Sequence, residues 1–151
     1  MILTPHIIAG AALATQINNP ILLAISALTL HHFLDVTPHW DYDIYRSKKK
    51  TAIKVGIDIV VASIIILYLV WDLRLEKQIS IILGGFFGVL PDGLLFINII
   101  SGRKLFVRFV KFHDFWHHLI IKKDKKPPLV LGLATQIIAL TISFIVLGIF
   151  R

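Results

Sequence analysis

Cysteine is absent from the sequence, and acidic residues are few, with nine Asp and Glu against sixteen Lys and Arg. Without cysteine the chain forms no disulfide bond and offers no thiolate to a metal ion. It also lacks internal repeats, low-complexity tracts and any glycine-rich motif for nucleotide binding. No basic region precedes the first apolar residues, so we expect no cleaved signal peptide at the N-terminus.

Apolar residues are abundant and make up 56% of the 151 residues. Soluble domains rarely reach this fraction. Three segments are each about 20 residues long and almost wholly apolar, which is the length needed to cross a hydrocarbon core of roughly 30 Å. The sequence therefore predicts an integral membrane protein with one membrane-embedded domain over residues 1–151. The three segments are Ile53–Trp71, Ile79–Ile100 and Leu129–Phe150.

Helices are expected throughout, because the apolar runs are too long for strands and do not alternate with polar residues. A further apolar stretch, Ile7–Leu34, is interrupted by Asn18, Asn19 and Pro20, which predicts a turn between two helices. The expected fold is an all-α bundle of about five main helices, comprising two helical hairpins, a short interfacial helix and a C-terminal span. The predicted helices are Pro5–Ile17, Pro20–Asp35, Thr51–Leu73, Lys77–Ile100, Val107–Ile121 and Pro128–Phe150.

Basic residues give the chain a net charge of +7. They are clustered in three segments beside the apolar runs, which is typical of cytoplasmic loops that contact anionic lipid headgroups. We therefore expect a multi-pass protein of the cell (inner, cytoplasmic) membrane whose partners are membrane lipids. Nucleic-acid binding would also explain basic clusters, but we expect none. The basic segments are residues 46–54, 103–111 and 122–126.

The seven histidines gather in three places, namely residue 6, residues 31–39 and residues 113–118. Two acids, Asp58 and Asp92, stand alone within otherwise apolar segments. Imidazole and carboxylate groups are costly to bury in apolar surroundings, and a bound metal ion is a common compensation. An acid within a membrane span is in itself a reason to expect function.

Two pairs of these residues are equidistant from a predicted turn. His6 and His31 are each 12.5 positions from the midpoint of the first turn, and Asp58 and Asp92 are each 17 positions from residue 75. Because each arm of a helical hairpin rises about 1.5 Å per residue, equidistant residues lie at the same height. We therefore expect the histidine clusters and both acids to form one layer. This layer also carries the basic loops, so the site is expected to face the cytoplasm.

Spacing within the clusters indicates metal binding. His31 and Asp35 are four residues apart on one helical face, and so are His113 and His117. Imidazole and carboxylate without thiolate are the ligands of catalytic zinc, and their number suits two ions bridged by a carboxylate. We expect a divalent metal, zinc, as one or two ions. The candidate ligands are His6, His31, Asp35, His39, Asp58, Asp92, His113 and His117.

Catalytic and substrate-binding roles are also expected for residues of this layer. Asp92 or Asp58 is expected to orient or deprotonate a water molecule. The basic side chains of Lys50, Arg108 and Lys111 are expected to attract an anionic headgroup.

Simpler explanations remain open for the same residues. Asp58 lies four positions after Lys54 on one helix, so the two can form an ion pair. Asp92 lies between Pro91 and Gly93 and can cap a helix segment. The histidines can serve as interfacial or hydrogen-bonding side chains without any ion.

Several short motifs, taken together, resemble those of the bacterial membrane-bound metal-dependent hydrolases. They are Thr4-Pro5-His6 followed by Gly10-Ala-Ala, the block His31-x3-Asp35-x2-Pro38-His39, and Leu90-Pro91-Asp92. That family is distantly similar to the zinc-dependent phospholipase C and P1 nuclease group. The resemblance implies an all-α metal site that cleaves phosphoesters. It implies as ligands His6, His31, Asp35, His39, Asp92, His113 and His117.

The sequence thus predicts a metal-dependent membrane hydrolase that acts on a phospholipid or another membrane-associated phosphoester through a metal-activated water. One alternative is a non-enzymatic membrane protein whose polar layer binds a structural metal or conducts ions or protons past Asp58 and Asp92. Only Ser63 and Ser80 interrupt the apolar path beyond these acids, which favours a site open to one side. Another alternative is a membrane anchor that recruits nucleic acid through its basic loops.

Overall fold

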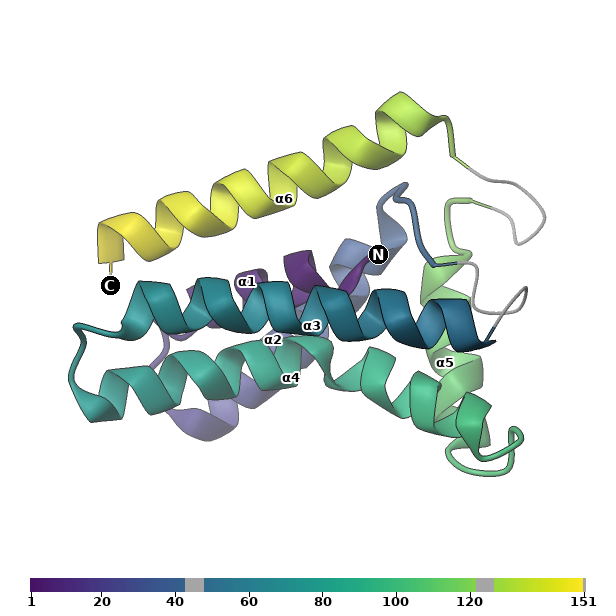
Figure 1. The fold of residues 1–151 in the computed structure, drawn as a ribbon, viewed down its shortest axis with the longest axis horizontal. Coiled ribbons are helices and arrows are strands. Elements are labelled where there is room, and N and C mark those ends of the chain that lie inside the picture. The colour runs from purple at the N-terminus through teal and green to yellow at the C-terminus, as the bar shows by residue number, and fades with distance from the viewer. Residues whose placement is uncertain (43–47, 122–126, 151) are drawn as a thin grey trace.

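The computed structural model describes residues 1–42, 48–121 and 127–150, and in these ranges the chain is all-helical without strands. The expected all-α bundle is confirmed, with helix ends that differ by a few residues from those predicted. The predicted basic segment at 122–126 and Arg46 lie outside the described residues. The helices are α1 (Leu3–Leu13), α2 (Pro20–Val36), α3 (Lys48–Val70), α4 (Leu75–Ile100), α5 (Val107–His117) and α6 (Leu129–Phe150) (Figure 1).

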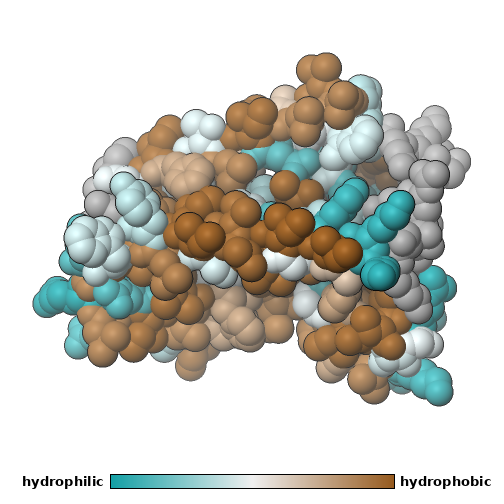
Figure 2. Space-filling view, in the orientation of Figure 1, coloured by the Kyte–Doolittle hydropathy of each residue, from teal (hydrophilic) through white to brown (hydrophobic). Residues whose placement is uncertain are grey.

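Three of the helices are long and apolar enough to cross a membrane. They are Lys49–Val70, Leu75–Ile100 and Leu129–Gly148, whereas α1 and α2 are shorter. Figure 2 shows apolar side chains spread across the face that α3 and α4 form, with hydrophilic side chains gathered toward its two ends. Contiguous apolar surface of this extent is unusual on a soluble monomer and suits contact with lipid. The chain is therefore a membrane protein by the length and composition of its helices.

The central helix is α1, which packs against α2, α3, α4 and α6. Its small and aliphatic side chains, among them Ile8 and Ala11, form the core together with Ile81 of α4 and Leu147 of α6. The next helix begins at Pro20 because Asn19 accepts hydrogen bonds from the backbone N–H groups of the first turn of α2, both at 3.0 Å. The predicted turn between the first two helices is thus present.

Charged side chains from neighbouring helices cap both ends of α1. The Asp58 carboxylate of α3 accepts hydrogen bonds from the backbone N–H groups of Leu3, at 2.6 Å, and Thr4, at 3.2 Å. The Lys77 ammonium of α4 donates to the carbonyls of Ala14 and Thr15, both at 3.3 Å. Buried helix ends leave backbone groups without helical partners, and these signs of charge also suit the helix dipole.

The backbones of α1 and α4 are in close contact where the two helices cross. A Cβ added at Gly10 would overlap the Gly84 carbonyl oxygen, and one added at Gly88 would overlap the His6 carbonyl oxygen. Glycine at such positions lets helices in a membrane approach closely. The crossing therefore places the first turn of α1 directly beside the middle of α4.

A bend divides α4 shortly after this crossing. Pro91 lies inside the helix and has no N–H to donate to the carbonyl of Phe87, so the helix bends there. Figure 1 shows the second half of α4 diverging from α3 and running toward α5. The residue directly after the proline is Asp92, which the bend turns toward the end of the bundle that carries α5.

Candidate metal centre

The structure brings seven of the eight predicted metal ligands into one cluster. The cluster is assembled from four helices and the loop after α2, and most of its side chains are buried. Its members lie where the first turn of α1, the end of α2, the bend of α4 and the inner face of α5 meet. They are His6 of α1, His31 and Asp35 of α2, His39 of the following loop, Asp92 of α4, and His113 and His117 of α5.

Asp35 is the centre of the cluster and is fully buried. Its Oδ2 lies 2.9 Å from His31 Nε2, 3.3 Å from His113 Nε2 and 3.0 Å from His117 Nε2. Its Oδ1 lies 3.1 Å from His6 Nε2. Although three imidazole nitrogens surround Oδ2, none of the described residues makes a hydrogen bond with it that satisfies the geometric requirements. A cation beside this oxygen would complete the compensation that a buried carboxylate requires.

Backbone carbonyls set the protonation of two of the histidines. His31 Nδ1 lies 2.8 Å from the Gly88 carbonyl oxygen, and His39 Nδ1 lies 2.7 Å from the Thr37 carbonyl oxygen. Because a carbonyl can only accept, each Nδ1 carries the proton and donates it. In the neutral ring Nε2 then has a free electron pair, as in metal-binding histidines whose other nitrogen is held by a carbonyl.

Protonation compensates the carboxylates only in part. Burial lowers the pKa of His113, but its hydrogen bonds with Asp35 and Asp92 outweigh burial and raise that pKa to about 9. Burial, with the nearby His31, lowers the pKa of His6 to about 4. Burial also lowers the pKa of His39 to about 3. His6 and His39 are therefore neutral at pH 7, which is the form of imidazole that binds metal.

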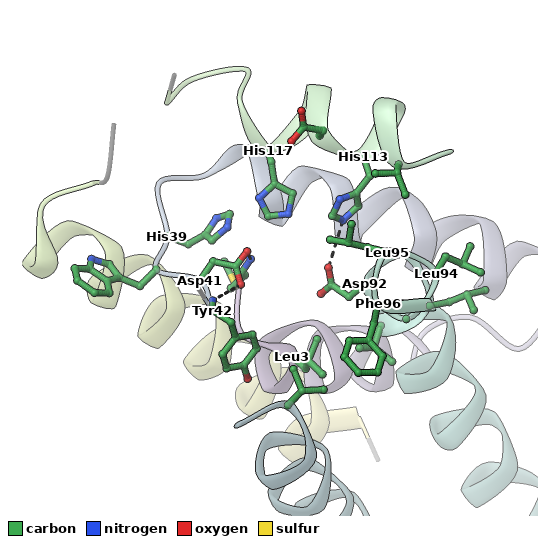
Figure 3. Close-up of a pocket in the computed structure, with 18 of the residues that line it drawn as sticks. Leu3, His39, Asp41, Tyr42, Asp92, Leu94, Leu95, Phe96, His113 and His117 are labelled. Atoms are coloured by element: carbon green, nitrogen blue, oxygen red, sulfur yellow. Dashed lines mark hydrogen bonds and ion pairs between the residues drawn. The ribbon is translucent and has the colours of Figure 1, made fainter. Parts of the chain in front are cut away.

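Two groups of side chains have ligand atoms close enough to hold a metal ion. In each group all ligand atoms lie within 4.8 Å of one another, and Asp35 belongs to both. Figure 3 shows His39, His113 and His117 turned with Asp92 toward a common space. The first group is His31, Asp35, Asp92 and His113, and the second is Asp35, His39 and His117.

Asp58 lies apart from this cluster. Its carboxylate accepts hydrogen bonds from the start of α1 and from the Tyr42 hydroxyl. Asp58 and Asp92 were expected in one layer because they are equidistant from the turn between their helices. Position along a helix does not, however, fix the direction in which a side chain points. Because its oxygens are engaged at the start of α1, the structure does not bring Asp58 together with the other seven predicted ligands.

The three predicted headgroup-binding residues are exposed. Lys50 lies at the start of α3, and Arg108 and Lys111 lie on α5. As far as the chain is described, none of them lines the cavity beside the cluster.

Residues of α6, which the sequence analysis did not single out, hold the loop that carries His39. The Thr135 hydroxyl donates to the Pro38 carbonyl, and Gln136 Nε2 donates to the Trp40 carbonyl at 3.1 Å. The Trp40 ring packs on Gly132, where an added Cβ would overlap it. Polar residues in an otherwise apolar span were the signal that could have identified this contact.

Two further groups that the sequence analysis left out of the site lie at its edge. The α-amino group of Met1 lies 3.2 Å from Asp35 Oδ1 and 3.8 Å from Asp41 Oδ2. Asp41 also lines the adjoining cavity, which has a volume of about 630 Å³. Neither group belongs to a recognisable ligand spacing, so sequence alone did not mark them.

No family model, curated protein or solved structure matches the chain. What the described residues establish is a membrane protein with buried histidine and aspartate side chains that can hold a metal ion. The donor set fits such an ion, because the Nε2 atoms of three imidazoles lie within 3.3 Å of one buried carboxylate oxygen.

Proposed function

We propose that the protein is a metal-dependent hydrolase of the cell membrane that cleaves a phospholipid or another membrane-associated phosphoester. The observation that carries the proposal is the setting of Asp35 Oδ2, which three imidazole Nε2 atoms approach within 3.3 Å. A buried carboxylate oxygen this close to several imidazole nitrogens is typical of a site that holds a cation. The resemblance of the motifs to membrane-bound metal-dependent hydrolases agrees with this assignment.

Zinc, as one or two ions, is the metal that we propose. Imidazole nitrogen and carboxylate oxygen without thiolate are the donors of catalytic zinc sites. Asp35 is common to both ligand groups, so its carboxylate would serve an ion in either group. A zinc ion supplies Lewis acidity, which lowers the pKa of a water molecule toward ~7 and polarises a phosphoryl oxygen.

The protein's own residues orient the reactants. Asp92 lines the cavity, its Oδ1 lies 3.3 Å from His113 Nε2, and its Oδ2 has no hydrogen-bond partner among the described residues. We assign this second oxygen the role of orienting a water molecule and accepting its proton. The Gly88 carbonyl fixes the ring of His31, and α6 fixes the loop of His39, so both imidazoles are held in place before substrate binds.

The site is proposed to open at the cytoplasmic face. The start of α3 and the whole of α5 lie at the same end of the bundle as the cluster (Figure 1). These elements carry Lys50, Arg108 and Lys111, and basic residues beside spans favour the cytoplasmic side. Their charge attracts anionic headgroups to the region around the cavity. Ion or proton conduction is less well supported, because Asp58 caps α1 instead of facing Asp92.

Metal analysis of detergent-purified protein, paired with an activity assay, tests the proposal. Wild-type protein is expected to contain stoichiometric zinc, and Asp35→Asn is expected to weaken metal binding at least about tenfold. Asp72→Asn, in the turn at the opposite end of the bundle, is the matched control and keeps its metal. Hydrolysis of phospholipid vesicles should be lost with the metal. Folded wild-type protein without any stoichiometric transition metal would contradict the proposal.

A further inference from the structure

The cavity beside the metal centre has two chemically different walls. Its volume, about 630 Å³, is in the usual range for pockets that bury a small ligand. Figure 3 shows His39, His113 and His117 on one side and Leu3 and Phe96 on the other. The apolar lining also includes Val55 and Ile59 of α3. A ligand that fills both parts of the cavity needs a polar group and an apolar group.

The apolar wall opens onto the surface of two membrane-spanning helices. Ile59 of α3 and Phe86 and Ile97 of α4 line the cavity and are also 44%, 53% and 40% exposed. Ile59 lies ten residues from Lys49, the end of its span, which is about 15 Å along a helix. Since a hydrocarbon core is roughly 30 Å thick, this opening lies among lipid chains rather than in water.

The bend in α4 creates this opening. Beyond Pro91 the helix diverges from α3 (Figure 1), and residues of both helices, Ile59 of α3 and Leu94 of α4 among them, line the cavity there. Gly93 follows at the bend, lines the cavity, and has no described atom within 4 Å of the position of an added Cβ. Asp92 lies between these two residues. The same bend therefore directs a carboxylate to the metal centre and separates the helices beside it.

We propose that a membrane lipid enters this cavity laterally from the bilayer, with its hydrocarbon chain between α3 and the second half of α4 and its polar group at the metal centre. The assignment of the polar group as a phosphoester rests on the proposed function. The wall that the chain contacts includes Val55, Ile59 and Phe96. A cavity of this volume holds the polar group and the first part of one chain, while the remainder of the lipid stays in the membrane.

A lipid chain fits this opening better than any water-soluble occupant does. A chain that passes between the two spans moves from one apolar environment to another, so it is never exposed to water. A soluble phosphoester reaches the polar wall but leaves the apolar wall of the spans without a contact. The apolar lining also extends along α4 away from the cluster. Phe86, which lines the cavity, lies six residues before Asp92, or about 9 Å along the helix, so a long ligand can lie with its polar end at the cluster.

Blocking the opening with a bulky side chain tests lateral entry. Ile59→Trp places a large ring at the opening, and Ile64→Trp makes the same change at an exposed position of α3 that does not line the cavity as described. Each variant is reconstituted and assayed on vesicles of phosphatidylglycerol and phosphatidylethanolamine, and on soluble bis(4-nitrophenyl) phosphate. Ile59→Trp is expected to lower the ratio of vesicle hydrolysis to soluble-substrate hydrolysis about tenfold. Ile64→Trp should change neither rate.

A photo-crosslinking measurement tests the same inference without relying on catalysis. Phosphatidylglycerol with a diazirine in one acyl chain is irradiated in the reconstituted membrane, and labelled residues are mapped by mass spectrometry. Val89 and Leu95, which line the cavity, are expected to be labelled, and Ile59→Trp should reduce this labelling while Ile64→Trp should not.

The two measurements separate the inference from the function on which it rests. Labelling of Val89 and Leu95 without metal or hydrolysis would support lateral binding and contradict the proposed hydrolase. Metal and hydrolysis that persist equally in both tryptophan variants would support the hydrolase and overturn lateral entry. Labelling that ignores Ile59→Trp would overturn it as well.

Discussion

At the scale of single residues, the candidate site depends on side chains that are held by neighbours outside the ligand set. His31 is fixed by the Gly88 carbonyl, and the loop of His39 is fixed by Gln136 from α6. Ligands held in this way keep one ring nitrogen directed at the metal position before any ion binds. Metal affinity should therefore respond to residues that touch no ion.

Gln136→Leu is the sharpest test at this scale. Loss of the hydrogen bond to the Trp40 carbonyl frees the loop of His39, so zinc affinity is expected to fall about tenfold while the fold is kept. Competition with a chromophoric chelator measures the change. Gln78→Leu, at a glutamine that bonds a turn carbonyl away from the site, is the control and should bind zinc as wild type does. Equal affinity in both variants would remove the role assigned to α6.

At the scale of elements, the position of α1 decides the geometry of the centre. It is capped by Asp58 and Lys77 and pressed against α4 through glycines, and its first turn carries His6 to Asp35. Loss of the Asp58 cap and loss of the glycine contacts should both destabilise α1. Only loss of the glycine contacts should also reduce zinc binding.

Asp58→Ala removes the cap without touching the cluster. The free energy of unfolding of the variant is expected to fall by about 1–2 kcal/mol, because the N–H groups of Leu3 and Thr4 lose their acceptor. Its zinc content per folded protein should remain that of wild type. Thermal unfolding in detergent followed by metal analysis measures both quantities. If the variant is folded but has lost its zinc, Asp58 is itself a metal ligand.

Gly84→Ala disturbs the crossing of α1 and α4. The added methyl group would overlap the Gly10 carbonyl, so the helices must separate, and destabilisation of about 1–3 kcal/mol with loss of zinc is expected. Gly56→Ala on α3, where no described atom lies within 4 Å of the new carbon, is the matched control. If the two alanine variants had the same stability and zinc content, close packing would not position the site.

The sequence predicted the positions of the site residues along their helices better than the directions in which their side chains point. Equal spacing from the first turn brought His6 and His31 together, and their rings stack with centroids 4.1 Å apart. The same reasoning failed to separate Asp58 from Asp92, because rotation about a helix axis depends on tertiary packing and not on distance from a turn. Thr135 and Gln136 were missed because their partners are carbonyls of a loop far away in the sequence.

At the scale of the whole molecule, the proposed orientation places the site and the α3–α4 turn on opposite sides of the membrane. Since the chain contains no cysteine, single cysteines report this directly. Lys50→Cys is expected to react with a membrane-impermeant maleimide only from the cytoplasmic side, and Glu76→Cys only from the other side. Reaction of both from one side would contradict the arrangement of the spans.

Diffraction at the zinc absorption edge shows whether Asp35 is a metal ligand. Crystals of wild-type protein grown with zinc present are expected to show an anomalous peak beside Asp35 Oδ2, between the Nε2 atoms of His31, His113 and His117. The peak should be absent from crystals of Asp35→Asn. If zinc analysis shows one or more zinc ions per protein but the wild-type map has no anomalous peak at Asp35, Asp35 is not a metal ligand.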